Sequence, residues 1–227
     1  MGPAFSFGAA TRKAAAMSDS EAIPAATLIV MRDRPGLFPE IVMVERPRTM
    51  AFAGGAMVFP GGRIDSDDHQ GATGLEQAAI RAAVRETAEE TGLAVDAAQL
   101  VPFARWRPDN VSHRRFDTFF FIAPAPDDSG PLLPQPGECE RAIWTTAEAM
   151  LDDVRSGSAR AIFPTIRNLE RLAQFASFAD ARHHALAHPV EVISPWIEEA
   201  DGERWLTIPS HLGYPVTRER LDIALRA

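Results

Sequence analysis

The chain has 227 residues, of which 46% are hydrophobic, so it can bury one sizeable core and carry an extension. Its formal net charge of −8 argues against a nucleic-acid partner, because surfaces that bind nucleic acid are usually basic. No apolar run approaches the roughly 18 residues of a membrane span. A single cysteine, Cys139, excludes an intrachain disulfide and favours a reducing compartment, so we expect a cytoplasmic protein.

The first half of the chain predicts strands followed by one long helix. Residues 1–21 lack the apolar stretch of a secretory signal and predict a disordered leader; a true start at Met17 and a cleaved targeting peptide are the alternatives. Apolar and β-branched runs predict strands, and a helical pattern ending before Gly92 predicts a helix. The predicted strands cover residues 25–33, 40–46, 52–62, 99–107 and 115–123, and the helix covers residues 75–91.

The second half predicts another strand, two helices and a hairpin. Residues 140–144 form the strand, and Thr145 with Glu148 predicts a capping box for a helix ending near Gly157. Pro164 suits the first turn of a helix that runs towards residue 184. Asp201-Gly202 predicts a tight β-hairpin. We therefore expect one α/β domain at residues 22–160, with a helical and β-hairpin extension at residues 161–227 packed on it.

The helix at residues 75–91 carries the most informative pattern. Glu86, Glu89 and Glu90 fall within about a 100° arc of one face. Three carboxylates this close repel one another, and Mg²⁺, which binds carboxylate oxygens, would compensate them. The alternative is a solvated acidic face paired with nearby arginines. On the opposite side, the predicted core stripe consists of Ile80, Val84, Ala88 and Thr91.

The string RETAEETGL at residues 85–93, with FPGG at residues 59–62 upstream, resembles the box of the Nudix hydrolases, GX5EX7REUXEEXGU. Arg85, Glu86, Glu89 and Glu90 fit the pattern, whereas Thr87 occupies an aliphatic position. By spacing, Gly71 is the first glycine of the box and Gln77 stands where a glutamate is usual. Alternatively, Gly62 is that glycine and the loop is longer.

The resemblance implies a Nudix fold, in which a mixed β-sheet lies between helices, and a hydrolase that cleaves a diphosphate bond. It implies Mg²⁺ or Mn²⁺ as the cofactor. Glu86, Glu89, Glu90 and the carbonyl of Gly62 would be the metal ligands, and the three glutamates with Arg85 would be the catalytic residues. Glu89 would act as ligand or base; Glu138 and Glu140 are further candidates for the base.

Residues 45–68 are similar to the motif that precedes the box in coenzyme A diphosphatases. The matches include Arg46, Gly55, Asp65 and Asp68, but alanines at positions 51 and 53 replace the usual basic residue and histidine. The implied substrate is coenzyme A or acyl-coenzyme A, cleaved to 3′,5′-ADP and (acyl-)phosphopantetheine. The predicted substrate-binding residues are Arg46, Gly61, Arg114 and Arg115.

Two other functions stay open. One is a diphosphatase of ADP-ribose or a dinucleotide, and the other is a nucleotide-sensing Nudix domain without hydrolysis. In each case the expected partner is a small-molecule nucleotide, with no nucleic acid and no membrane. A homodimer is compatible with the resemblance.

Overall fold

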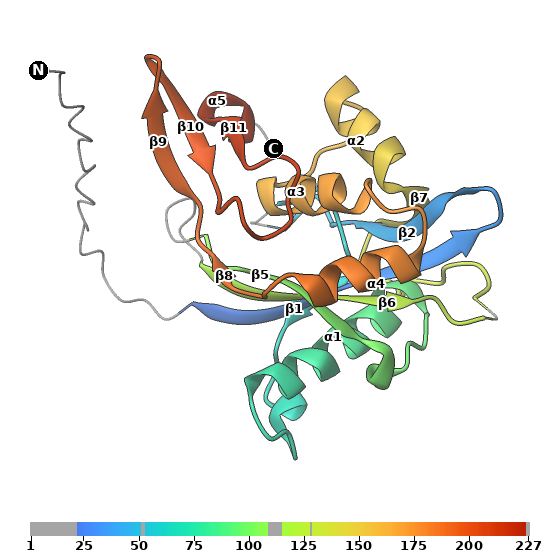
Figure 1. Cartoon of the computed structure of the whole chain (residues 1–227). Helices are drawn as coiled ribbons and strands as arrows, with labels where there is room; N and C mark the ends of the chain where they lie inside the picture. Colours follow the sequence, from blue (N-terminus) through green and yellow to red (C-terminus); the bar gives the residue numbers. More distant parts are fainter. Residues whose placement is uncertain (1–21, 51–52, 109–114, 128, 226–227) are drawn as a thin grey trace, which may run out of the picture.

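The computed structural model describes residues 22–50, 53–108, 115–127 and 129–225. A mixed β-sheet lies between helices, as predicted: α1 (Leu75–Thr91) covers one face, and α3 (Phe163–Leu172) and α4 (Phe178–Ala187) lie on the other (Figure 1). α2 (Ala147–Ser156) and the short α5 (Leu221–Ala224) complete the helices of the described residues, with single 3₁₀ turns at Asp67–His69 and Ala97–Gln99.

The main sheet has the strand order β3-β2-β1-β6-β5-β8, with β4 paired to β1 and β7 paired to β2. Its strands are β1 (Ile23–Arg34), β2 (Leu37–Glu45), β3 (Met57–Val58), β4 (Gly61–Arg63), β5 (Val101–Trp106), β6 (Phe116–Pro124), β7 (Arg141–Thr146) and β8 (Val192–Ile193). β1 and β6 run parallel at the centre of the sheet. A second, antiparallel sheet in the order β11-β10-β9 consists of β9 (Trp196–Ala200), β10 (Glu203–Thr207) and β11 (Arg218–Arg220).

β1 is buried on both faces, which explains its nearly continuous apolar sequence. Leu28 and Val30 pack on the α1 side with Ala79, Ala82 and Ala83. The alternate residues of β1, Ile29 and Met31, pack on the other side with residues of α2, α3, α4 and the C-terminal sheet. Because successive side chains of a strand point to opposite faces, β1 separates two apolar clusters.

The predicted core stripe of α1 was correct in part: Thr91 is buried, and Ile80 and Val84 pack against the edge of the core. Ile80, Val84 and Ala88 are only partly buried, whereas the alanines at positions 78, 79, 82 and 83 are fully buried together with Thr87 and Thr91. These small side chains allow the helix to lie close to the sheet. Thr87 fits there because its hydroxyl donates to the carbonyl oxygen of Ala83 at 2.7 Å, so a buried polar side chain is satisfied within the helix.

Two predictions in the second half also need correction. The single helix expected from Pro164 to residue 184 is two helices, and Ser177 begins the second by accepting a hydrogen bond from the Asp180 amide. The cap of α2 is Thr146 rather than Thr145, since the Thr146 hydroxyl accepts from the Ala149 amide at 3.1 Å. The hairpin at Asp201-Gly202 is confirmed as the β9–β10 turn. None of the helices in the described ranges is long and apolar enough to span a membrane.

Candidate active site

A glycine pair in β4 brings the sheet against two glutamates of α1. The Gly61 amide donates to the Glu90 carboxylate at 2.9 Å. A Cβ on Gly62 would overlap the Glu86 carboxylate, and a Cβ on Gly61 would overlap the backbone of β1 at Ala26 and Thr27. Glycine at position 61 is therefore required by the close approach of the β1 backbone, whereas a side chain at position 62 would displace the Glu86 carboxylate. Glu86 and Glu90 thus lie beside the same strand.

Arg85 is the centre of an ion-pair cluster that fixes one of these glutamates. Its guanidinium lies 2.9 Å from Asp68, 2.8 Å from Glu86 and 3.1 Å from Glu89. It also donates to the Arg63 carbonyl oxygen at 3.1 Å. The hydrogen bond to Asp68, above all, raises the pKa of Arg85, so this arginine is a permanent cation that orients Glu86.

Asp68 anchors the loop between β4 and α1 to the same cluster. Asp68 is 5% exposed, and its carboxylate accepts the Asp65 amide at 2.9 Å. Burial alone would raise the pKa of Asp68, but hydrogen bonds from Arg85 and from the Asp65 backbone outweigh it and lower the pKa. Asp68, which lies in the motif that precedes the box, thus forms an ion pair with Arg85 of the box.

The two glutamates beside β4 share an unfavourable electrostatic environment. Burial raises the pKa of Glu86, opposed by the hydrogen bond from Arg85. Burial also raises the pKa of Glu90 to about 8; the Gly61 amide opposes this shift, and the charge of Glu86 adds to it. A buried carboxylate (Glu90) beside a partly buried one (Glu86) forms an environment that a bound cation would stabilise.

The donor set fits a divalent cation only in part. Within the described ranges, no group of three or more His, Cys, Asp or Glu side chains converges on one point. Glu89 is held by Arg85, whereas Glu86 and Glu90 both line the adjacent cavity with Gly61 and Gly62. One or two carboxylates, completed by water and substrate phosphates, is an ordinary ligand set for Mg²⁺, so Glu86 and Glu90 are suited to hold the ion.

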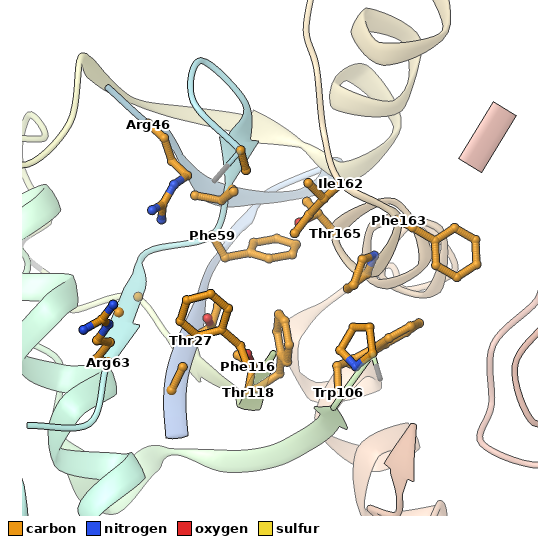
Figure 2. A pocket seen from close by; sticks show the side chains of 18 of the residues that line it. Thr27, Arg46, Phe59, Arg63, Trp106, Phe116, Thr118, Ile162, Phe163 and Thr165 are labelled. Atoms are coloured by element: carbon orange, nitrogen blue, oxygen red, sulfur yellow. The ribbon is translucent and has the colours of Figure 1, made fainter. Parts of the chain in front are cut away.

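This cavity has a volume of about 690 Å³ and runs from the glutamates to an aromatic end. Figure 2 shows Arg46 and Arg63 at one end, and Trp106 and Phe163 at the other. The floor between them is formed by alternate residues of β1 and β6. These are Ala25, Thr27, Phe116, Thr118 and Phe120. A ligand that is charged at one end and apolar at the other would match this distribution.

Two arginines stand at the charged end, and only one was predicted from the sequence. Burial lowers the pKa of Arg46, while the charges of Glu90 and Glu86 oppose this. Among the described residues its Nε has no hydrogen-bond partner and is buried. Arg63 also lines the cavity. The sequence feature that could have predicted Arg63 as a site residue is its position directly after the glycine pair.

The loop between β6 and β7 adds a fourth acid to the cavity, besides Asp65, Glu86 and Glu90. Its backbone amides at Leu133 and Gln135 donate to the α1 carbonyls of Thr91 and Glu89 at 2.8 and 2.9 Å. Of the two glutamates in this loop considered as a base, Glu138 lines the cavity. Between them, the Cys139 thiol has a pKa raised to about 11, mainly by burial, which makes it a poor nucleophile.

Several predicted site residues lie elsewhere. Glu89 contacts Arg85 and is not among the cavity-lining residues of the described chain. Arg115, immediately before β6, is not among them either. Arg114 lies outside the described residues. Of the two candidate box glycines, Gly62 lies against Glu86, whereas Gly71 contacts Arg81. Gln77 accepts a hydrogen bond from the Thr73 amide.

Residues 22–165 match the NUDIX domain family. The structure is similar to that of a NUDIX hydrolase from Alicyclobacillus acidocaldarius, with 26% identity and a TM-score of 0.66 over 73% of this chain and 97% of that one. Its fold is also similar to that of the NUDIX domain of Shewanella oneidensis NrtR, complexed with ADP ribose (15% identity, TM-score 0.51, covering 68% and 88% of the two chains). Comparison with curated proteins gives no match. Because the family match spans more than half of the chain, the protein belongs to the NUDIX domain family and is a Nudix hydrolase.

Proposed function

We propose that this Nudix hydrolase is a cytoplasmic, Mg²⁺- or Mn²⁺-dependent diphosphatase of coenzyme A or acyl-coenzyme A. Water would attack one phosphorus of the diphosphate and the bridging P–O bond would break, giving 3′,5′-ADP and (acyl-)phosphopantetheine. The observation that carries the proposal is the cavity, which joins four acids and two arginines to an apolar end. Coenzyme A has a matching shape, with a diphosphate between a phosphorylated nucleoside and a long arm.

Each group at the charged end has a role in this proposal. Glu86 and Glu90 hold the cation, and Arg85 positions Glu86. A bound Mg²⁺ or Mn²⁺ would neutralise the diphosphate and lower the pKa of a water molecule. Arg46 and Arg63 bind phosphate oxygens, for which a guanidinium fork is suited. The unpartnered, buried Nε of Arg46 supports this role.

We assign the acceptance of the proton from the attacking water to Glu138. It lies in the same cavity as Glu86 and Glu90, and its charge acts on Glu90. Glu89 was another candidate base, but its contact with Arg85 favours a positioning role for it.

The proposal is tested by incubating the purified protein with Mg²⁺ or Mn²⁺ and a panel of coenzyme A, acetyl-coenzyme A, ADP-ribose, NADH and a diadenosine polyphosphate. Products are identified by chromatography and mass. Release of 3′,5′-ADP from coenzyme A or its thioester, with higher kcat/KM than any other cleavage, is the expected result. Preferential cleavage of ADP-ribose or a dinucleotide would mean that this compound, and not coenzyme A, is the substrate. Binding of a nucleotide without any cleavage would favour the sensing function.

A further inference from the structure

The apolar end of the cavity includes the C-terminal extension as well as the domain that matches the family. Leu206 of β10 and Ala224 of α5 line this end, and both lie beyond the matched residues 22–165. They belong to the same buried cluster as Trp106 of β5 and Phe163 at the start of α3, which lie at the end of the cavity away from Arg46 and Arg63 (Figure 2). The extension therefore contributes to the apolar end of the cavity.

A chain of buried hydrogen bonds ties Trp106 to this extension. The Trp106 indole N–H donates to the Tyr214 hydroxyl at 3.1 Å, and that hydroxyl donates to the Asn168 side-chain oxygen at 2.9 Å. Trp106 is 1% exposed, Tyr214 5% and Asn168 0%. Since buried donors without partners are costly, this chain permits one orientation of the indole.

Edge-to-face ring contacts hold the same orientation. Trp106 lies 6.0 Å from Phe163 at an interplanar angle of 81°, and 5.8 Å from Tyr214 at 89°. Such T-shaped pairs are preferred geometries for aromatic side chains. Tyr214 in turn lies under the Arg171 guanidinium of α3, at 5.1 Å. The indole is thus fixed from two sides, by α3 and by the loop between β10 and β11.

We infer that the C-terminal extension is the specificity element of this enzyme: the edges of Leu206 and Trp106 that line the cavity contact an acyl chain on the far side of the diphosphate, and Tyr214 positions Trp106. The inference rests on the proposed function, because it assumes that the diphosphate lies at Glu86 and Glu90. An acyl chain fits this end because it presents no polar group to the apolar wall. The enzyme then discriminates acylated from free coenzyme A.

The first test compares coenzyme A with octanoyl-coenzyme A in steady-state assays with Mg²⁺. The wild type should prefer the octanoyl substrate in kcat/KM by about tenfold, the usual scale of discrimination in an apolar pocket. Trp106→Ala and Leu206→Ala should remove most of this preference through KM. Tyr214→Phe should reduce it while circular dichroism and thermal unfolding show a folded protein. A role of Tyr214 in stability alone would leave the substrate ratio unchanged.

Ile197→Ala is the matched control, because Ile197 is an exposed apolar residue of β9 in the same extension and does not line the cavity. It should keep the wild-type ratio. A Leu206→Met variant, which nearly conserves volume, should also keep it, and this separates loss of contact from misfolding. If Trp106→Ala and Leu206→Ala retain the wild-type preference, the inference is overturned.

A second measurement separates this inference from the proposed function. Binding of coenzyme A and octanoyl-coenzyme A is measured by calorimetry in the Glu90→Gln variant, without turnover. Tighter binding of the octanoyl compound, lost when Trp106→Ala is added, supports the apolar subsite even if the wild type cleaves neither compound, in which case only the proposed function fails. Equal binding of the two compounds overturns the inference even if both are cleaved.

Discussion

The two ends of the cavity are built in opposite ways. At the charged end, Gly61, Gly62, Asp68, Arg85 and Glu90 come from one stretch of the chain and meet through short ionic contacts. At the apolar end, the contacts of Trp106 with Tyr214 and of Tyr214 with Asn168 join residues 108 and 46 positions apart. The charged end is a compact motif, whereas the apolar end exists only after the extension has folded onto the sheet.

The two ends also differ in how they hold polar groups. At the charged end Glu86 pairs with Arg85 and Glu90 accepts the Gly61 amide, yet both remain less stable as carboxylates than they would be in water. At the apolar end the Trp106 indole and the Tyr214 hydroxyl are satisfied in a buried chain, whereas Arg167, Asn168 and Arg171 behind them keep buried nitrogens without a hydrogen-bond partner among the described residues. Changes at the charged end should therefore affect catalysis more than folding, and the following experiments test this difference.

The largest effect should come from Glu90→Gln. Loss of the carboxylate should lower kcat by about 10³-fold, at the upper end for one electrostatic contact in an active site. Stability should not fall, because burial disfavours the charged form of Glu90 and glutamine can still accept the Gly61 amide. Assays and thermal unfolding measure the two quantities. Glu76→Gln, on the exposed first turn of α1, is the control; activity retained in Glu90→Gln would contradict the metal assignment.

Glu138→Gln should lower kcat by about 10²–10⁴-fold if Glu138 is the general base. Glu140, two residues later in the same loop, is not among the cavity-lining residues of the described chain, so Glu140→Gln is the matched control and should leave kcat within about twofold of wild type, within the usual small range of surface substitutions. The pair is compared at several pH values with the substrate that the panel identifies. Equal loss in both variants would mean that the loop matters and the carboxylate of Glu138 does not.

Gly62→Ala should displace the Glu86 carboxylate, which occupies the place of the added methyl group. A shift of about 1 Å in a catalytic group can lower the rate by about 100-fold. Gly130→Ala is the control, because a Cβ at Gly130 would meet no atom within 4 Å. Metal affinity, measured by Mn²⁺ titration, should weaken in Gly62→Ala only. Unchanged affinity and rate would place the ion away from β4.

Arg85→Lys tests the ion-pair cluster itself. A lysine keeps the charge but cannot contact Asp68, Glu86 and Glu89 together as the guanidinium does. We expect a loss of about 10–100-fold in metal affinity or activity, the range for residues that orient ligands. Arg81→Lys, one turn earlier on α1, serves for comparison and should lose far less. An Arg85→Lys enzyme with normal activity would remove Arg85 from the mechanism.

The smallest effect should appear on the extension side, at the stacked His184 and His188 rings, 4.1 Å apart. Burial, followed by the charge of Arg171, lowers the pKa of His184 to about 4. The unfolded chain, with a histidine pKa of about 6.5, binds more protons between these values, so the stability present at neutral pH is lost as pH falls through this window. Glu170, whose pKa is raised to about 7 mainly by burial, acts in the opposite direction.

Because Glu170 and His184 change the stability in opposite directions as pH falls, the contribution of His184 is measured by comparing a His184 variant with the wild type. Urea unfolding at pH 7 and pH 5 should show a smaller loss of stability in His184→Gln than in the wild type. His211→Gln, at an exposed position on the same side, should behave like the wild type. Equal losses in all three proteins would exclude His184 as the source.

Much of the charged end could be predicted from the sequence. The helix at residues 75–91 has the predicted bounds, and Glu86 and Glu90 lie on the cavity side as their spacing required. The prediction of which side chains of α1 are buried was correct only in part. Periodicity favoured Ile80 and Val84, but the sheet approaches so closely that alanines and Thr87 fill the contact. The distance between a helix and the sheet is set by tertiary packing, and the periodicity of the helix sequence does not predict it.

The sequence by itself determined the family box, the β9–β10 hairpin and most of the strands, because each depends on local patterns of two to eighteen residues. Only the tertiary structure decided that Glu89 forms an ion pair with Arg85 and that Arg63 lines the same cavity as Arg46. It also decided that Glu138 lines this cavity, whereas Glu140 is not among the lining residues of the described chain. It alone joined Trp106 to Tyr214. The physical reason is that these contacts depend on how distant segments pack. A hydrogen bond between residues far apart in the chain produces no periodic pattern from which it could be predicted.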